Sequence, residues 1–313
     1  TFPGQYIAAY LDSYFCILII HAIQSLIHFI LKGKYKVFVS DFVSLRRKTI
    51  KTPVMIKAIF FDIDGTLVSF RTHTVPESTR KALKRLRAQG IKLFIATGRP
   101  KLLIDTLNDL EFDGYITLNG AYCFTADHHD IYKGSIPHSD IEQLVAYCRN
   151  HDYPFVFVHD NEWFITHVNA DVEEISRLIA IPVPPVRPVE EALQTDILQT
   201  MGYFKVDADN EIFQQILPHC EPMRWHPLFA DIIARGNSKS RGMDEVIAYY
   251  GIRLEETMAF GDGGNDIPML KHAGIGVAMG NAAPEIQAAA DYVTTSVDDD
   301  GILHALQHFQ ILV

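Results

Sequence analysis

Short apolar runs alternate with amphipathic stretches between residues 57 and 118, and this alternation predicts strands separated by helices. Buried strands are expected at Lys57–Ile63, Lys92–Thr97 and Gly114–Leu118. Helices are expected over about 76–89, which ends before the stop signal Gly90, and over about 100–110. Buried strands that alternate with helices predict a doubly wound, parallel α/β sheet with right-handed connections.

The same alternation returns in the carboxyl-terminal part of the chain. Further strands are expected over residues 257–261, 276–279 and 292–295, and further helices over 239–250, 266–272, 284–289 and 301–309. Because the two regions share one pattern, we expect a single α/β core with a Rossmann-like sheet. The core is predicted to consist of residues 55–136 and 226–313.

The segment between these two regions, residues 137–225, follows a different pattern. The apolar runs Phe155–Val158 and Trp163–Thr166 flank Asp160 and Asn161, which predicts a hairpin. Helices are expected over about 139–151, 170–181 and 210–217, and strands over 200–206 and 224–233. We therefore expect an inserted α+β domain with a small sheet, whose core contains the aromatic residues of the hairpin.

The first 54 residues form an extension that differs from the rest of the chain. An uncharged, mostly apolar stretch runs from Ser13 to Leu31 and is barely long enough for a bilayer core of about 30 Å. Three interpretations stay open: a membrane-associated helix, a helix packed on the body, and an upstream extension foreign to the natural protein. The first methionine is Met55, just before the first strand, which favours the third.

Composition narrows the classes of function. The chain has 313 residues, 48% of them hydrophobic, and a net charge of −10. Residues 1–54 hold seven basic and two acidic residues, a net charge of +5, so residues 55–313 carry −15. An acidic body disfavours nucleic-acid binding. The four cysteines are widely spaced, which is typical of a reducing compartment, and we expect a cytoplasmic protein whose only membrane contact would be through residues 13–31.

Two carboxylates follow the first predicted strand directly. Asp62 and Asp64 in the motif Asp-Ile-Asp-Gly-Thr are two residues apart, so in extended chain both face the same side. At about 4 Å, two such charges repel by about 4 kcal/mol when the effective dielectric constant is near 20. A cation or a proton is therefore expected between them, and a divalent metal ion is the best candidate.

Three further polar motifs are predicted at the same end of the sheet. They are Thr97-Gly98-Arg99 after the second strand, Lys239 at the start of a helix, and Gly261-Asp262-Gly-Gly-Asn265-Asp266 after a later strand. With Asp-x-Asp-Gly-Thr, these motifs in this order resemble the haloacid dehalogenase-like (HAD) hydrolases, in particular the Cof-type sugar phosphatases. The resemblance covers about residues 56–311. It implies that the inserted domain is a C2-type cap, for which His159, Trp163 and Arg224 are candidate substrate contacts.

The resemblance also implies roles for single residues. Asp62 is the expected nucleophile, which forms an aspartyl-phosphate, and Asp64 the expected general acid and base. The expected Mg²⁺ ligands are Asp62, the backbone carbonyl of Asp64, and Asp262, with Asp266 either as a ligand through water or as a partner of the residues that bind the ion. The groups expected to hold the phosphoryl oxygens are Thr97, the amide of Gly98, Lys239 and Asn265. For Asn119 and Arg99 the alternatives stay open: Asn119 orders the cleft or touches substrate, and Arg99 pairs with a nearby acid.

These expectations predict a Mg²⁺-dependent phosphatase of small phosphorylated metabolites, with sugar phosphates as the favoured substrates. A sugar phosphomutase is the nearest alternative, and a membrane-tethered binding protein without turnover is a second. The oligomeric state is left open by the sequence. Other chemistry is disfavoured: Thr66 and His73 do not fit a calcium loop that begins at Asp62, and the glycines over 274–280 have the wrong spacing for a dinucleotide site.

Overall fold

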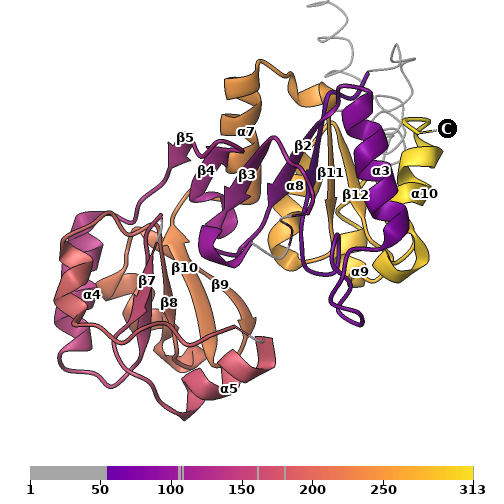
Figure 1. Cartoon of the computed structure of the whole chain (residues 1–313). Coiled ribbons are helices and arrows are strands. Elements are labelled where there is room, and N and C mark those ends of the chain that lie inside the picture. Colours follow the sequence, from indigo (N-terminus) through magenta and orange to yellow (C-terminus); the bar gives the residue numbers. More distant parts are fainter. Residues whose placement is uncertain (1–54, 105–106, 108, 161, 180, 313) are drawn as a thin grey trace, which may run out of the picture. The chain divides into compact units, whose positions relative to one another are not determined.

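Two β-sheets organise the part of the chain that the structure describes (Figure 1). The structure is a computed structural model and describes residues 55–104, 107, 109–160, 162–179 and 181–312. Met55–Val313 form one compact unit. The interpretations of residues 1–54 fall outside the described residues. Within the described ranges, no helix combines the length and the apolar character that a membrane span requires.

The larger sheet has eight strands in the order β13-β12-β11-β1-β2-β3-β4-β5. The six strands from β13 to β3 pair in parallel, and β4 and β5 add antiparallel pairs at one edge. The predicted α/β fold with a mostly parallel sheet is therefore confirmed. In chain order, the strands are β1 (Ala58–Phe61), β2 (Lys92–Ala96), β3 (Gly114–Thr117), β4 (Tyr122–Thr125), β5 (Asp130–Lys133), β11 (Thr257–Gly261), β12 (Ile275–Ala278) and β13 (Tyr292–Val293).

Helices cover both faces of this sheet, which explains why the central strands are continuous apolar runs. On one face, Ile59 and Phe61 pack in a cluster with α3 (Glu77–Ala88) and α10 (Gly301–His308). On the other face, Ala58 and Phe60 pack with α7 (Lys239–Tyr250), α8 (Ile267–His272) and α9 (Pro284–Gln287). All four residues of β1 are buried as a result.

The smaller sheet has five antiparallel strands in the order β7-β6-β8-β10-β9. Its strands are β6 (Phe155–Val158), β7 (Trp163–Ile165), β8 (Gln199–Gly202), β9 (Cys220–His226) and β10 (Phe229–Ala234). Its helices are α4 (His138–Cys148), α5 (Ala170–Ile179) and α6 (Asp209–Glu211), which continues into a π-helical turn at Ile212–Ile216. The helix α4 packs on one face of the sheet and α5 on the other.

The predicted boundary between residues 225 and 226 is wrong, because it lies inside β9. Both β9 and β10 pair in the smaller sheet, so the inserted segment continues to Ala234. The boundary was misplaced because pairing with β8, some thirty residues earlier in the chain, decides which sheet these strands join.

Two further predictions about single elements need correction. The helix expected over 100–110 is not continuous: Lys101–Leu103 form a 3₁₀ turn, and Ile104 leaves helical geometry at φ −99° and ψ 0°. Among the described residues that follow, the amides of Leu107 and Leu110 donate to the carbonyls of Ile104 and Leu107, three residues earlier, so the chain forms separate tight turns in place of one α-helix. No element was predicted over residues 121–136, where the structure forms β4 and β5.

Candidate active site

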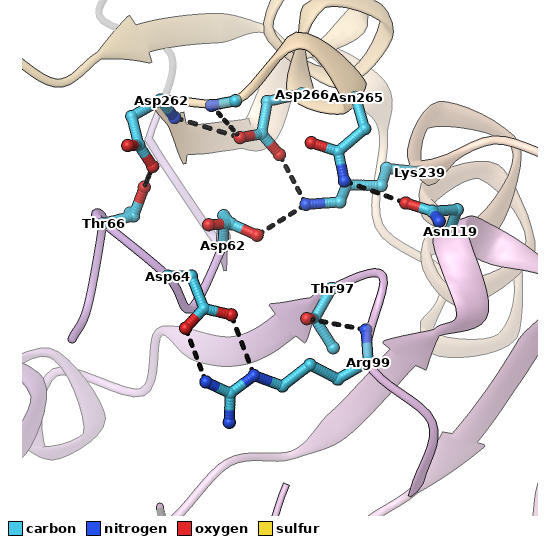
Figure 2. Close-up of polar contacts among 11 residues, drawn as sticks. Asp62, Asp64, Thr66, Thr97, Arg99, Asn119, Lys239, Asp262, Asn265 and Asp266 are labelled. Atoms are coloured by element: carbon cyan, nitrogen blue, oxygen red, sulfur yellow. Dashed lines mark hydrogen bonds and ion pairs between the residues drawn. The ribbon is translucent and has the colours of Figure 1, made fainter. Parts of the chain in front are cut away.

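The polar motifs meet at one edge of the larger sheet. The strands β11, β1 and β2 are neighbours and run in parallel, with Phe61 opposite both Phe260 and Ile95. Asp62, Thr97 and Asp262 each follow one of these strands directly, so they lie at the same edge of the sheet. Figure 2 shows their side chains close together with those of Lys239 and Asp266.

A buried ammonium group lies between two carboxylates. The Nζ atom of Lys239 donates to Oδ1 of Asp62 and to Oδ1 of Asp266, each at 2.6 Å (Figure 2). Lys239 and Asp266 are 1% and 0% exposed, and Asp62 is 7% exposed. Lys239 is the first residue of α7, whose amino end is capped by Ser238, which accepts a hydrogen bond from the amide of Arg241 at 3.1 Å. The cap fixes where the helix begins and so where the lysine stands.

Burial and neighbouring charges together determine the pKa values of Asp62 and Lys239. Burial raises the pKa of Asp62 well above its usual value, and the nearby carboxylates of Asp266 and Asp262 raise it further, against the opposing effect of Lys239. For Lys239, burial lowers the pKa, but the charges of Asp266 and Asp62 outweigh burial and raise it. The lysine is therefore a fixed positive charge at neutral pH.

Asp266 organises the loop that also carries Asp262. Its Oδ2 atom accepts hydrogen bonds from the amides of Asp262 at 3.0 Å and Gly263 at 2.8 Å, while Oδ1 accepts from Lys239. Three donors already surround this carboxylate. This arrangement favours a role in which Asp266 positions the residues around the ion, and its binding of the ion through water stays a prediction.

Asp262 is oriented by side chains from two other loops. Its Oδ1 accepts from the hydroxyl of Thr66 at 2.9 Å, and its Oδ2 accepts from Nδ2 of Asn281 at 2.9 Å. Burial is the main cause that raises the pKa of Asp262, to about 6. Gly65 also bears on this position, because a Cβ atom there would lie 2.1 Å from Oδ2 of Asp262, and its φ of +83° favours glycine.

Asn281 is a site residue that sequence reasoning missed. Besides Asp262, its Nδ2 donates to the carbonyl of Gly65 at 2.9 Å, and its Oδ1 accepts from the amide of Val297 at 3.0 Å. It thus ties the loop after β12 to the loop after β1 and to a carboxylate. The available signal was its position three residues beyond the end of β12, the next parallel strand beside β11.

The acids form a cluster of the kind that holds a metal ion. Asp62, Asp262 and Asp266 each offer a carboxylate oxygen, and these oxygens lie within 4.8 Å of one another. Carboxylate oxygens suit hard divalent cations. Burial and the neighbouring carboxylates raise the pKa values of Asp62 and Asp262, and a divalent cation beside them would favour their ionised forms. The residues therefore fit a divalent cation. The carboxylate of Asp64 is outside this cluster, and the participation of its backbone carbonyl stays a prediction.

Asp64 is held by Arg99. The Nε atom of Arg99 donates to Oδ2 of Asp64 at 2.8 Å and Nη2 to Oδ1, a two-point contact, while Nη1 donates to the carbonyl of Leu103 at 3.1 Å (Figure 2). This contact agrees with the role that the sequence suggested for Arg99. The Asp64 side chain is 41% exposed, so a ligand can reach it.

The residues expected to hold phosphoryl oxygens lie around the same edge. The hydroxyl of Thr97 accepts from the amide of Arg99 at 3.1 Å, which shapes the turn after β2. Nδ2 of Asn265 donates to Oδ1 of Asn119 at 2.9 Å. Asn119 is 1% exposed and has a left-handed backbone at φ +53°, and a Cβ atom on Gly98 would lie 3.1 Å from its amide. These contacts favour an ordering role for Asn119.

We expect Lys239→Met to lower the free energy of unfolding by about 3–5 kcal/mol at pH 7.5 in the presence of a chelator, because it leaves two carboxylates buried without their cation. The loss should be smaller at pH 5, because burial and the neighbouring carboxylates raise the pKa of Asp62 and favour its protonated form there. Urea denaturation at the two pH values measures both effects. The exposed Lys205→Met is the control, with an expected change within about 0.5 kcal/mol. A loss at pH 7.5 no larger than that of the control would contradict the prediction.

Comparison with known proteins relates this geometry to a family. The family model of haloacid dehalogenase-like hydrolases matches residues 59–306. A curated relative, the putative phosphatase YkrA of Bacillus subtilis, is 35% identical over 270 residues, which are 82% of this chain and 98% of the relative.

Solved structures show the same relationship. The subclass IIB sugar phosphatase BT4131 is 46% identical with a TM-score of 0.74, and the match covers 82% of this chain and all of that one. The phosphatase BT1666 from Bacteroides thetaiotaomicron is 40% identical with a TM-score of 0.78, over 84% of this chain and 98% of that one. The chain thus belongs to the haloacid dehalogenase-like hydrolases and has the phosphatase fold of that family.

Proposed function

We propose that this chain is a Mg²⁺-dependent phosphatase that hydrolyses small phosphorylated metabolites through an aspartyl-phosphate. The observation that carries the proposal is the buried ammonium of Lys239, which lies between Asp62 and Asp266 beside the carboxylate of Asp262. Phosphoryl transfer depends mainly on positioning and on neutralisation of charge. The fixed ammonium of Lys239 and a cluster of acids that fit a metal ion lie at one edge of the sheet. Together they can position the phosphoryl group and neutralise its charge.

In the proposed reaction, an oxygen of Asp62 attacks phosphorus, and the bond from phosphorus to the leaving oxygen breaks. Asp64 gives its proton to the leaving oxygen. In the second step Asp64 takes a proton from a water molecule, whose oxygen attacks phosphorus, and the bond to Asp62 breaks to release inorganic phosphate. General acid and base assistance of this kind contributes about 10²- to 10⁴-fold.

The contact between Arg99 and Asp64 bears on this proton transfer. A guanidinium that binds both oxygens fixes the direction of the carboxylate. To give a proton to the leaving oxygen and later take one from water, Asp64 must reach both groups, so we infer that the contact with Arg99 loosens when substrate binds.

The remaining residues position the phosphoryl group. Lys239 and Asn265, the hydroxyl of Thr97 and the amide of Gly98 are the proposed donors to its oxygens. Asp62, Asp262 and the carbonyl of Asp64 would hold Mg²⁺, with Asp266 as an indirect partner. When bound, the ion would neutralise negative charge on the phosphoryl group.

The substrate class follows from the relatives, one of which is described as a sugar phosphatase. We propose sugar phosphates or related small phosphate esters as substrates, with the inserted domain as the cap that selects the leaving group. A cytoplasmic location stays a prediction. It is in keeping with the free state of Cys123, Cys148 and Cys220, the cysteines of the described region.

We expect Asp62→Asn to abolish turnover, on the order of 10⁴-fold or more, because an amide oxygen is a far weaker nucleophile than a carboxylate. The measurement is release of inorganic phosphate from a panel of phosphate monoesters with Mg²⁺ present, and circular dichroism verifies the fold. Asp207→Asn, an exposed acid of the cap, is the control and should retain full activity. Undiminished hydrolysis by Asp62→Asn would remove Asp62 from the nucleophile role. A sugar phosphomutase would instead yield an isomeric sugar phosphate without release of phosphate.

Without divalent ions, the stability of the protein should fall as pH rises, and Mg²⁺ should oppose this fall. The folded-state pKa values of Asp62 and Asp262, the latter about 6, lie above the unfolded value, so the folded state binds more protons between about pH 4 and 6. Without divalent ions, Tm should therefore fall as pH rises through this window. Mg²⁺ binds the ionised carboxylates and should raise Tm strongly at pH 7.5 and little at pH 5.

Thermal unfolding at both pH values, with chelator or with MgCl₂, measures this effect. Asp262→Asn is the matched variant, because it removes one titrating ligand and should flatten both the pH dependence and the response to Mg²⁺. An equal rise of Tm by Mg²⁺ at pH 5 and 7.5 would argue against ion binding by these carboxylates.

Asn281→Ala should weaken Mg²⁺ binding by about 10- to 100-fold, because Asn281 orients a proposed ligand without binding the ion itself. The measurement is the Mg²⁺ dependence of Tm, together with the Mg²⁺ concentration that gives half-maximal phosphate release. Gln287→Ala is the matched control, since Gln287 contacts the carbonyls of Gly280 and Ala282 in the same loop but not Asp262. Equal Mg²⁺ affinity in the two variants would show that the contact to Asp262 has no such role.

A further inference from the structure

An exposed aromatic side chain lies beside the cluster of acids. The ring of Phe70 is 64% exposed. A Cβ atom on Gly65 would lie 2.7 Å from Cε2 of this ring and 2.1 Å from Oδ2 of Asp262, so both groups border the same point of the backbone. The edge of the ring therefore lies next to a carboxylate that is a proposed ligand of the metal ion.

The position of Phe70, more than its exposure, requires an explanation, since single exposed apolar side chains are common on protein surfaces. Tyr249 is another exposed aromatic residue of the described region, but it lies near the carboxyl end of α7, whereas Lys239 begins that helix at the catalytic edge. Ten residues of α-helix span about 15 Å. Phe70, in contrast, is an exposed aromatic residue at the proposed site itself.

The turn that carries Phe70 is fixed from both sides. The hydroxyl of Ser69 accepts from the amides of Arg71 at 3.0 Å and Thr72 at 3.2 Å. The same hydroxyl donates to Oδ1 of Asp298 at 2.8 Å, and Nη2 of Arg71 donates to this oxygen at 3.2 Å. Because both neighbours of Phe70 are bound to Asp298, the backbone is ordered before a ligand binds, which lowers the entropic cost of a contact with the ring.

The fold does not bury the ring. Leu67 and Val75 of the same segment belong to the buried cluster that contains Phe61. Phe70 belongs to none of the buried clusters of the described residues. The favourable transfer of a phenyl ring out of water is therefore unused in the protein alone, and an apolar partner that covers the ring would gain that free energy.

Phe70 lies in the segment that also carries the proposed acid. Asp64 pairs with Val68 in an isolated β-bridge, and the amide of Gly65 donates to the carbonyl of Val68 at 2.9 Å. This tight loop returns the chain to Asp64 two residues before Phe70. In the proposed reaction Asp64 gives its proton to the leaving oxygen, so the leaving group lies on the side of the site where this segment lies.

Arg224, a candidate from the sequence for contact with the substrate, is engaged by the fold. Its guanidinium pairs with Asp209, donates to the carbonyls of Phe204 and Phe229, and lies over the ring of Phe204 at 4.8 Å. These contacts give Arg224 a structural role. Selection of the leaving group then falls to other side chains.

We propose that Phe70 forms an apolar wall against which the leaving group packs, so that the chain prefers phosphate monoesters whose leaving group presents a ring or another apolar face close to the ester oxygen. The inference rests on the proposed phosphatase function and names a feature of its substrates. Aromatic rings favour edge-on and offset contacts with their partners, so a ring on a fixed turn also orients the leaving group. A leaving group without such a face binds without this contact.

The test compares benzyl phosphate with methyl phosphate, two esters of primary alcohols that differ by the ring. We expect kcat/KM of the wild-type protein to be about tenfold or more higher for benzyl phosphate. For Phe70→Ala, the ratio of the two kcat/KM values should fall about 5- to 20-fold, because the wall is lost. Release of inorganic phosphate with Mg²⁺ present is the measurement, and circular dichroism verifies the fold.

Two further variants control for the ring and for exposure. Phe70→Tyr keeps the ring and should leave the ratio within about twofold of the wild-type value. Tyr249→Ala removes an exposed aromatic side chain at the opposite end of α7 from Lys239 and should leave the ratio unchanged. A fall of the ratio in Phe70→Tyr as large as that in Phe70→Ala would overturn the role of the ring.

The outcomes separate this inference from the proposed function. If Phe70→Ala lowers kcat/KM equally for both esters, or for neither, Phe70 is not a wall for the leaving group, while phosphatase activity stands. The same holds if the wild-type protein hydrolyses other monoesters but does not prefer benzyl to methyl phosphate. Failure of the wild-type protein to release phosphate from any monoester would refute the proposed function and this inference with it.

Discussion

The buried contact of Lys239 with Asp62 and Asp266 is the interaction on which the site depends. Three carboxylates with oxygens within 4.8 Å of one another repel strongly where water is excluded, and the ammonium is the chain's own means of holding them together. The contact joins the ends of β1, α7 and the loop after β11. This contact of Lys239 therefore determines both the charge balance and the geometry of the site.

Other contacts place Asp262 and Asp64 in different environments. Thr66 and Asn281 turn the carboxylate of Asp262 toward the cluster, whereas Arg99 holds Asp64 apart from it. Asp62 and Asp64, which are separated by a single residue, thus lie in different electrostatic surroundings. Asp62 is buried and Asp262 half-buried, and the pKa values of both are raised, whereas Asp64, the acid proposed for proton transfer, is partly exposed and paired with a guanidinium.

The smaller sheet shows a similar division between its two faces. The face under α4 is apolar apart from groups that the fold satisfies, and it supplies stability. The other face carries the incompletely paired Gln199 and Asp231. In a sheet, alternate residues of one strand lie on the two faces, so apolar packing and buried polar contacts alternate along β8 and β10.

Local pattern alone determined the α/β core and the place of the acids, because buried parallel strands are strongly apolar and their carboxyl ends share one edge. It predicted Asp62, Thr97, Asp262 and Lys239 as neighbours, and the structure brings them to one edge. Only tertiary structure decided that β9 and β10 belong to the smaller sheet, that Asn281 reaches Asp262, and that Gln199 meets Asp231. Each of these depends on partners distant in the chain, whose pairing leaves no periodic signal in the sequence, whereas burial at a strand leaves a clear one.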